Sequence, residues 1–263
     1  LSKFYAPDNI NFFLGQIDYK NKRYDEALLH YERIQQGTFV NTKALNVSKV
    51  LLKKYNLEKA LSYIDKEIKI KNQNNLLNSL SLKLSIFEEI GESTDIINLS
   101  TQILQTFPNN ERALYSRALA YEKEGNILSM SKDFDEMIKL NKYNSIALNA
   151  YGYSLALHKL HLDKSEKLIR KALEIRPGEA AILDSLAWVL YLKGSYKEAA
   201  KYSSLAYSKD QDPEIIEHHY LILLKNGNSN EAKSILDQSI KNNPNSEKLL
   251  KLLDSSENAA IKL

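Results

Sequence analysis

The sequence predicts an all-α protein built as a solenoid of stacked helical hairpins. A small or apolar residue recurs every 33 to 36 residues, in a series called the second-helix register: Ala27, Ala60, Ile96, Met130, Ser165, Ala199 and Ala232. A parallel series, the first-helix register, runs twelve or thirteen residues ahead of it: Gly15, Ser48, Leu84, Ala118, Gly152, Ala187 and Tyr220. A fixed period of this length is the signature of a repeat architecture in which each unit packs only on its neighbours.

The spacing of apolar residues inside each unit is helical. Leu148, Tyr151 and Leu155 follow i, i+3 and i+7 spacing, which predicts one face of a helix and not an alternating strand. Each repeat is therefore expected to be a hairpin of two helices. The first helices are predicted near residues 8–21, 41–54, 77–90, 111–124, 145–158, 180–193 and 213–226. Their partners are predicted near residues 24–37, 57–70, 93–106, 127–140, 162–175, 196–209 and 229–242.

Glycine and proline mark the ends of these helices. Together they make up 13 of 263 residues, a composition typical of a chain that is almost wholly helical. Four glycines follow the first-helix register by seven residues, where a hairpin must turn and glycine can adopt the left-handed conformation. They are Gly91, Gly125, Gly194 and Gly227. Pro213 falls where a helix begins, a position at which the missing N–H costs little.

Small residues at both registers let neighbouring helices approach closely. Leu84, Met130 and Tyr220 are large residues at these positions. We therefore expect looser packing in the third, fourth and seventh repeats.

Composition and charge exclude several classes of function. The 36 basic and 33 acidic residues give a formal net charge of +3, and no run of like charge resembles a nucleic-acid-binding arm. The absence of cysteine excludes disulfides, thiolate zinc sites and a cysteine nucleophile from this sequence. No run of about 18 apolar residues could span a bilayer. The chain begins at Leu1 without an initiator methionine or an apolar signal region, so we expect a soluble protein trimmed at its amino terminus.

No arrangement of residues predicts catalysis. His158 and His161 fall where a first helix ends and the hairpin turns, and no third ligand stands at metal-binding spacing. His218 and His219 are adjacent and so face different sides of a helix, and one of them should pack in the core. Glycine-rich phosphate loops and nucleophile motifs are absent. We therefore expect a protein that is not an enzyme and has no catalytic residues, cofactor or metal site.

Two copies of the repeat resemble a known family. Asn11–Gly15 with Arg23–Leu28, and Leu183–Trp188 with Gly194–Ala199, resemble the tetratricopeptide repeat (TPR), a helix-turn-helix unit of about 34 residues. The resemblance implies a right-handed superhelix over residues 1–263 as a single domain. Its expected parts are the tail of a truncated repeat in residues 1–6, repeats at about 8–40, 41–76, 77–110, 111–144, 145–179, 180–212 and 213–245, and a capping helix in 246–263.

The same resemblance implies that one face of each first helix lines a concave groove. The densest group of candidate binding residues on that face consists of Asn149, Tyr153, Asp184, Trp188 and Tyr191. Aromatic anchors beside amide and carboxylate groups suit an extended peptide. Further binding candidates are Lys49, Lys53, Arg112 and Tyr115. The remaining groove-facing predictions are Phe12, Gln16, Tyr19, Leu45, Ser81, Ser85, Glu88, Glu122, Ala156, Glu217, Leu221 and Lys225.

The alternative role for Tyr153 and Trp188 is packing between repeats, which is common for aromatic residues on a solenoid helix. TPR domains that hold a terminal carboxylate use a lysine and an asparagine one turn apart on a first helix. The corresponding places in this patch hold Asn149 with Tyr153, and Asp184 with Trp188. Recognition of chaperone tails is therefore not expected.

Residues 145–216 resemble one group within the family more closely. Asn149–Leu155, Asp184–Tyr191 and Asp212–Ile215, with one extra turn residue before Ser165, are similar to the carboxyl-terminal part of bacterial outer-membrane TPR lipoproteins. Members of that group are adaptors that bind a periplasmic carboxyl-terminal processing protease and present cell-wall hydrolases to it. The resemblance implies those partners, a location in the bacterial periplasm at the outer membrane, and membrane attachment only through a lipid anchor outside this segment.

The leading hypothesis is a non-catalytic adaptor that binds a protein partner or an extended peptide in its groove, and no nucleic acid. Ala187 and Tyr220 depart from the lipoprotein group, which tends to carry glycine at both places. The alternative is a structural solenoid that organises a cytoplasmic or pilus-assembly complex by homo-oligomerisation.

Overall fold

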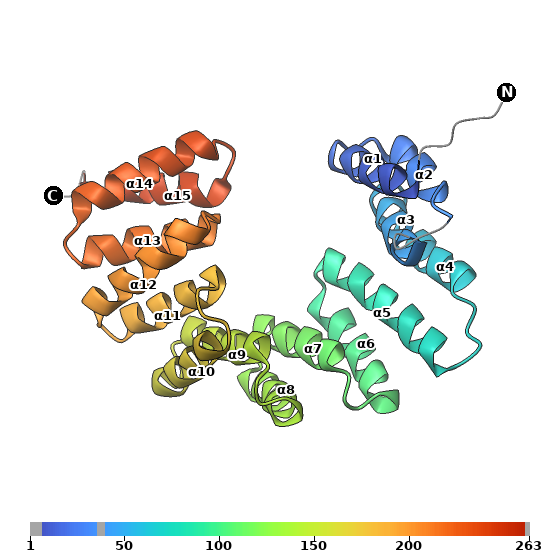
Figure 1. Ribbon diagram of the computed structural model, residues 1–263, viewed down its shortest axis with the longest axis horizontal. Coiled ribbons are helices and arrows are strands. Elements are labelled where there is room, and N and C mark those ends of the chain that lie inside the picture. The colour runs from blue at the N-terminus through green and yellow to red at the C-terminus, as the bar shows by residue number, and fades with distance from the viewer. Residues whose placement is uncertain (1–6, 36–39, 261–263) are drawn as a thin grey trace. The chain divides into compact units, whose positions relative to one another are not determined.

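The computed structural model describes residues 7–35 and 40–260, and this part of the chain holds fifteen α-helices and no strand (Figure 1). The first helices of the hairpins are α1 (Asp8–Lys20), α3 (Val40–Lys54), α5 (Gln73–Ile90), α7 (Glu111–Lys123), α9 (Ser145–Leu157), α11 (Ala180–Leu192) and α13 (Pro213–Lys225). Their partners are α2 (Tyr24–Glu32), α4 (Leu57–Glu67), α6 (Ser93–Thr106), α8 (Ile127–Leu140), α10 (Leu162–Ile175), α12 (Tyr196–Lys209) and α14 (Ser229–Asn242). The last helix is α15 (Glu247–Ala260). Among these helices of the described chain, none is both long enough and apolar enough to cross a bilayer.

Two compact units divide the chain: unit 1 comprises residues 1–133 and unit 2 comprises residues 134–263. The boundary falls inside α8. Within unit 1, α3 packs against α2, α4 and α5, and within unit 2, α11 packs against α9, α10, α12 and α13 (Figure 1). A first helix thus contacts its own partner, the second helix before it and a neighbouring first helix.

The predicted hairpins are present, and most helix bounds agree with the prediction to within one residue. The exceptions lie in unit 1, where α2 ends at Glu32 instead of near 37 and α4 ends at Glu67 instead of near 70. α5 begins four residues early, at Gln73, because the side chain of Asn72 caps it and accepts a hydrogen bond from the N–H of Asn75 at 3.0 Å. The predicted repeat tail in residues 1–6 lies outside the described residues.

Asparagine caps recur at the starts of helices. Within the described residues, five asparagine side chains each accept a hydrogen bond from the backbone N–H three residues later, at 2.8 to 3.1 Å. They are Asn56, Asn72, Asn110, Asn126 and Asn144. Each cap satisfies one of the free N–H groups of a helix start, an interaction worth about 1 kcal/mol. α13 is capped by Asp212 and carries Pro213 at its first position, as predicted.

The hairpin turns use left-handed backbone conformations. The four glycines predicted at these turns have positive φ angles, from 71° at Gly125 to 88° at Gly227. L-residues rarely adopt such φ angles, so glycine is needed at these turns for its backbone conformation. A Cβ atom would meet no close neighbour at these positions. The longer turn of the fifth repeat instead places Lys159 and His161 at φ angles of 54° and 46°. The pair His158 and His161 therefore lies at the turn, where the sequence placed it.

The residues of both registers are buried where the two helices of a hairpin meet. Small residues at these positions let the two helices lie close together. Ser165 on α10 donates a hydrogen bond from Oγ to the carbonyl oxygen of Gly152 on α9 at 2.6 Å. Leu84 and Tyr220 are also buried. However, α5 with α6 and α13 with α14 pack less closely than α9 with α10, as predicted for the third and seventh repeats.

Candidate functional site

Three first helices of unit 2 bring the predicted aromatic residues together. The imidazole of His218 on α13 stacks on the indole of Trp188 on α11, with ring centroids 4.1 Å apart. Trp188 stacks in turn on Tyr191, with centroids 5.0 Å apart. The ring of Tyr153 on α9 lies 6.2 Å from that of His218. Tyr153, Trp188, Tyr191 and His218 are called the aromatic cluster below.

The aromatic cluster has both a packing side and an exposed side. Trp188 and Tyr191 pack against the unit 2 core that contains Leu186 and Leu190. Both side chains, like that of Tyr153, nevertheless remain partly exposed. Packing between repeats therefore orients these rings, and the exposed parts remain available for contact with another molecule.

Asp184 is not an accessible groove residue, and this prediction was wrong. The residue is only 5% exposed, and its Oδ2 lies 2.8 Å from Nδ1 of His218. Burial raises the pKa of Asp184, and the hydrogen bond to His218 opposes that shift. The error arises because Asp184 faces the contact between α11 and α13. There its carboxylate orients the imidazole on which Trp188 stacks.

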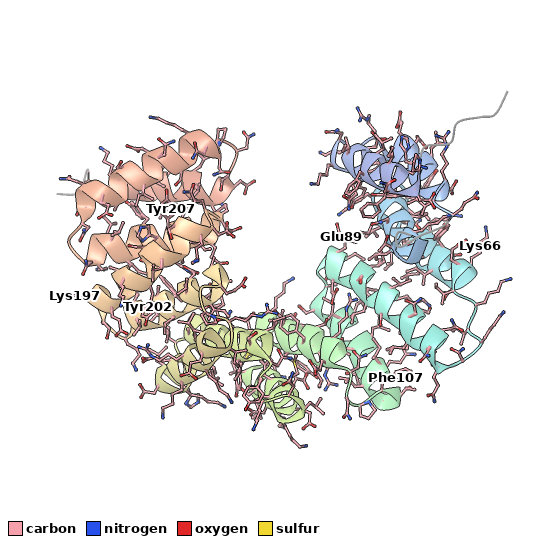
Figure 2. All side chains as sticks on the ribbon, in the orientation of Figure 1. Lys66, Glu89, Phe107, Lys197, Tyr202 and Tyr207 are labelled. Carbon is pink, nitrogen blue, oxygen red and sulfur yellow. The ribbon has the colours of Figure 1, made fainter. Side chains whose placement is uncertain are left out.

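His218 is the cluster residue that sequence reasoning missed. We expected one histidine of the pair to pack in the core, but His218 and His219 are both buried, with 4% and 2% exposure. His219 lies 2.8 Å from Ser203 Oγ through its Nδ1, and its ring stacks on that of Tyr207, which is labelled on α12 in Figure 2. His218 lies 34 residues after Asp184, which is one repeat. That spacing is the signal that could have paired them.

Polar groups border the aromatic cluster on α9 and α13. The hydroxyl of Tyr153 donates a hydrogen bond to Glu214 Oε1 at 2.6 Å. Burial, followed by this hydrogen bond, raises the pKa of Tyr153, so the phenol stays protonated as a donor. One turn earlier, the Oδ1 atom of Asn149 is buried and accepts no hydrogen bond within the described protein, and the same holds for Oδ1 of Asp184. An unsatisfied buried acceptor costs about 1–3 kcal/mol.

The two lysines of unit 1 that were predicted to bind a partner, Lys49 and Lys53, both form ion pairs with Glu89. Lys49 and Lys53 on α3 place their Nζ atoms 3.4 and 3.2 Å from the carboxylate of Glu89, and the hydroxyl of Tyr19 donates to it at 3.5 Å. Figure 2 shows Glu89 at the end of α5 nearest to α3. Burial alone would raise the pKa of Glu89, but the hydrogen bonds and charges of the lysines outweigh it, and the pKa is lowered.

Arg112 and Tyr115 lie on α7 in unit 1. Arg112 donates to Ser85 Oγ at 2.5 Å and to Glu88 Oε2 at 3.0 Å. Tyr115 is partly buried, which raises its pKa. Ser85 is only 8% exposed, so its assignment to an open groove face was wrong. These side chains form a polar network within unit 1 that is separate in the chain from the aromatic cluster of unit 2.

Ala156 was also predicted to face the groove, and it is fully buried. It lies one turn after Gly152 on α9 and packs in the core with Leu148, Ile169 and Leu186. In residues 7–35 and 40–260, no group of three or more His, Cys, Asp or Glu side chains is arranged to hold a metal ion.

Comparison with known proteins identifies the architecture. No protein-family model matches the chain. The TPR repeat-containing protein PA4667 of Pseudomonas aeruginosa is 26% identical over 211 residues, which cover 80% of this chain, and the chain spans 36% of the length of that relative. The crystal structure of a TPR protein from Parabacteroides merdae superposes with a TM-score of 0.66 at 16% identity, over 94% of this chain and 97% of the other. The fold is that of a TPR solenoid.

Two further solved structures with a similar fold are of MamA. One superposes with a TM-score of 0.51 at 21% identity, over 62% of this chain and 94% of MamA. The second, a double mutant of MamA RS-1, gives a TM-score of 0.52 at 17% identity, over 68% of this chain and 100% of the other. These likenesses concern the fold alone. Within this chain the aromatic cluster lies on the first helices of three successive hairpins, α9, α11 and α13.

Proposed function

We propose that this protein is a non-catalytic scaffold that binds a protein partner on the face formed by α9, α11 and α13. TPR folds generally mediate protein–protein interactions, which supports the general role. The observation that carries the site is the aromatic cluster, because three predicted contact residues from two repeats come together beside one buried histidine of a third repeat.

The cluster suits an extended segment of a partner. Trp188 and Tyr191 are stacked and fixed by their core contacts, so little side-chain entropy is lost when a partner binds. Partly exposed aromatic anchors of this kind contribute most of the binding energy in many interfaces. Asn149, one turn before Tyr153 on α9, is also partly exposed and places an amide side chain beside the aromatic rings.

The charge around the cluster favours a partner segment that carries a basic side chain. Asp184, Glu214 and Glu217 all act on Tyr153, and each raises its pKa. Lys248 offsets part of this charge through an ion pair with Glu217 at 2.9 Å. An apolar or aromatic residue next to a lysine or arginine is therefore the expected partner chemistry.

The resemblance over residues 145–216 supports a finer proposal, since that block contains most of the aromatic cluster. On this basis the partner is a carboxyl-terminal processing protease, and the bound segments belong to cell-wall hydrolases presented to it. The corresponding location is the bacterial periplasm, at the outer membrane through a lipid anchor outside the segment described.

The test is a binding comparison between variants. We expect a Tyr153→Ala/Trp188→Ala double variant to lose the partner captured by the tagged wild-type chain from a periplasmic extract. Its affinity should fall by at least about 30-fold, because anchor residues of this kind cost 2 kcal/mol or more on truncation. Tyr143→Ala is the matched control, since this tyrosine is 62% exposed and lies before α9.

Two outcomes would contradict the proposal. A folded double variant, checked by circular dichroism, that kept every partner would rule out this face as the site. A wild-type chain that captured no partner but formed a concentration-dependent dimer in light scattering would instead favour the structural solenoid that assembles by homo-oligomerisation.

A further inference from the structure

A cavity of about 210 Å³ lies between α1, α2 and α3 in unit 1, and it is called the donor cavity below. Among the described residues that line it, each side chain carries a hydrogen-bond donor and none is a carboxylate. They are Gln16, Tyr19 and Lys20 on α1, Tyr31 on α2, and Asn46 and Lys49 on α3. A single water needs about 10–15 Å³ of such space, so the cavity has room for a group of several heavy atoms.

Most of the donors that line the cavity have no partner. Within residues 7–35 and 40–260, the side chains of four lining residues form no hydrogen bond or ion pair: Gln16, Lys20, Tyr31 and Asn46. Tyr31 is only 2% exposed, yet its hydroxyl has no acceptor in this part of the chain. Burial, followed by the charge of Asp18, raises the pKa of Tyr31 to about 12, so the phenol keeps its proton. A buried donor without an acceptor is unfavourable, and an acceptor bound in the cavity would satisfy it.

Two carboxylates lie near the donor cavity, and both are already compensated. Asp18 accepts a hydrogen bond from Nε of Arg23 at 2.9 Å. Glu89 is paired with two lysines, since Nζ of Lys49 and Nζ of Lys53 lie 3.4 and 3.2 Å from its oxygens. One glutamate offsets only one of these two lysines, so one positive charge of the pair is left over.

The remaining charge and donors are available to a ligand. Lys20 adds a second positive charge, which no described carboxylate pairs with. The contacts to Glu89 are long, at 3.4 Å from Lys49 and 3.5 Å from the hydroxyl of Tyr19, whereas charge-assisted hydrogen bonds are usually about 2.7–2.9 Å. A lysine has three N–H donors, so Lys49 keeps donors for the cavity. The cavity therefore combines two uncompensated positive charges with donors from three helices.

We propose that the donor cavity binds a phosphate group, either as the free ion or as a phosphate monoester. A phosphate monoester carries a charge of about −1.5 to −2 at pH 7 and three strong acceptor oxygens, which matches the charge and the donors of the cavity. Tyr31 donates from the buried side, and Lys20 and Lys49 donate beside it. A carboxylate has one charge and two oxygens, so it would leave one positive charge uncompensated. This site belongs to unit 1, and its failure would leave the partner-binding role proposed for unit 2 untouched.

A titration of the 263-residue chain by isothermal calorimetry at low salt tests the proposal. The probes are inorganic phosphate, phosphoserine capped by acetylation and amidation, and acetate. We expect both phosphates to bind and acetate to bind at least about tenfold more weakly, because acetate lacks the second charge. Tighter binding of phosphoserine would support a phosphorylated side chain as the source of the group, and tighter binding of inorganic phosphate would support the free ion. A chain that bound neither phosphate, or bound acetate as tightly, would overturn the proposal.

Two variants place the binding in the donor cavity. Tyr31→Phe removes only the hydroxyl and should weaken phosphate binding by at least about tenfold, as the loss of a hydrogen bond to a charged group does. Tyr24→Phe is the matched control, because Tyr24 is on the same helix and does not line the cavity. Lys20→Gln should weaken binding by at least about fivefold at low salt and by less at high salt. Its control is Lys66→Gln on α4, whose site is labelled in Figure 2. Unchanged phosphate affinity in Tyr31→Phe or in Lys20→Gln would overturn the proposal.

Thermal stability separates a binding role of Tyr31 from a structural one. The hydroxyl has no acceptor in the chain alone, so Tyr31→Phe should have an unchanged or higher melting temperature without phosphate. Phosphate should raise the melting temperature of the wild type more than that of the variant, because a ligand stabilises the state that binds it. A variant that was less stable without phosphate but gained as much from phosphate as the wild type would show a structural hydroxyl and overturn the proposal.

Discussion

Replacing Gly152 by alanine should destabilise unit 2, although alanine is the better helix former. A Cβ atom at this position would lie 2.6 Å from Cγ1 of Ile169 and 2.9 Å from the backbone oxygen of Ser165. The isoleucine side chain can rotate, but the Ser165 oxygen belongs to the backbone of α10. The variant must therefore move α9 and α10 apart.

The magnitude follows from three opposing contributions. Alanine gains about 1 kcal/mol over glycine inside a helix. Overpacking of a tight contact costs about 1–3 kcal/mol. Separation of the helices also weakens the buried hydrogen bond from Ser165 Oγ to the Gly152 carbonyl, worth about 1 kcal/mol. The net loss is about 2 kcal/mol, which corresponds to a fall of about 4–8 °C in the melting temperature of a chain of this size.

Thermal unfolding followed by the fluorescence of Trp188 measures this loss, because Trp188 is the only tryptophan and lies in the neighbouring hairpin. Gly15→Ala is the matched control at the same register position, and its unfolding is followed by circular dichroism because it lies in unit 1 and Trp188 in unit 2. There the three nearest atoms to the added Cβ, at 2.6 to 2.9 Å, all belong to the buried ring of Tyr31 and none to the backbone of α2. One ring must shift instead of a helix, so the loss should be smaller. A Gly152→Ala variant as stable as the wild type, or more stable, would refute the reasoning.

Two further predictions concern buried polar groups. Burial lowers the pKa of His219 to about 4, so the folded state stays neutral while the unfolded state takes up a proton below its ordinary pKa of 6.5. Between pH 6.5 and 4 the free energy of unfolding should fall by up to about 3 kcal/mol. In urea titrations over the same range the His219→Asn variant should lose less stability than the wild type. A variant with the same pH dependence as the wild type would contradict this. Arg117→Ala should cost about 3–5 kcal/mol in urea unfolding, because it strands the 5% exposed carboxylate of Asp133, which Arg117 holds through two hydrogen bonds at 2.7 and 2.8 Å. The double variant with Asp133→Ala should regain part of that stability, and a double variant less stable than Arg117→Ala would argue against a stranded charge.

The repeat period was sufficient to predict the helices because each is specified by nearby residues. Turn glycines such as Gly125 and the proline that begins α13, Pro213, act within one helical turn, and their positions matched the structure. The prediction failed at the start of α5, where Asn72 caps the helix a turn earlier than the apolar pattern indicated. Asparagine also occurs at 74 and 75, so the sequence offers several candidate caps.

The candidate site was predicted only in part. Tyr153, Trp188 and Tyr191 do lie together, because the period places equivalent positions of successive first helices side by side. Asp184 was assigned to the wrong environment, and His218 was not included in the site. Both errors have one cause. On a first helix, the face that contacts the neighbouring repeat and the face that stays open are related by only a small rotation about the helix axis, so the apolar pattern does not separate them.

The sequence by itself determined the number and order of the hairpins, their turns and the residues at which helices approach most closely. These features depend on helical periodicity and on backbone conformations that single residues favour. Tertiary structure alone decided that Asp184 is buried against His218, and that His219 packs between Ser203 and Tyr207 of α12. Such outcomes depend on which helix lies against which face, and that is set by packing between repeats and not by the local chain.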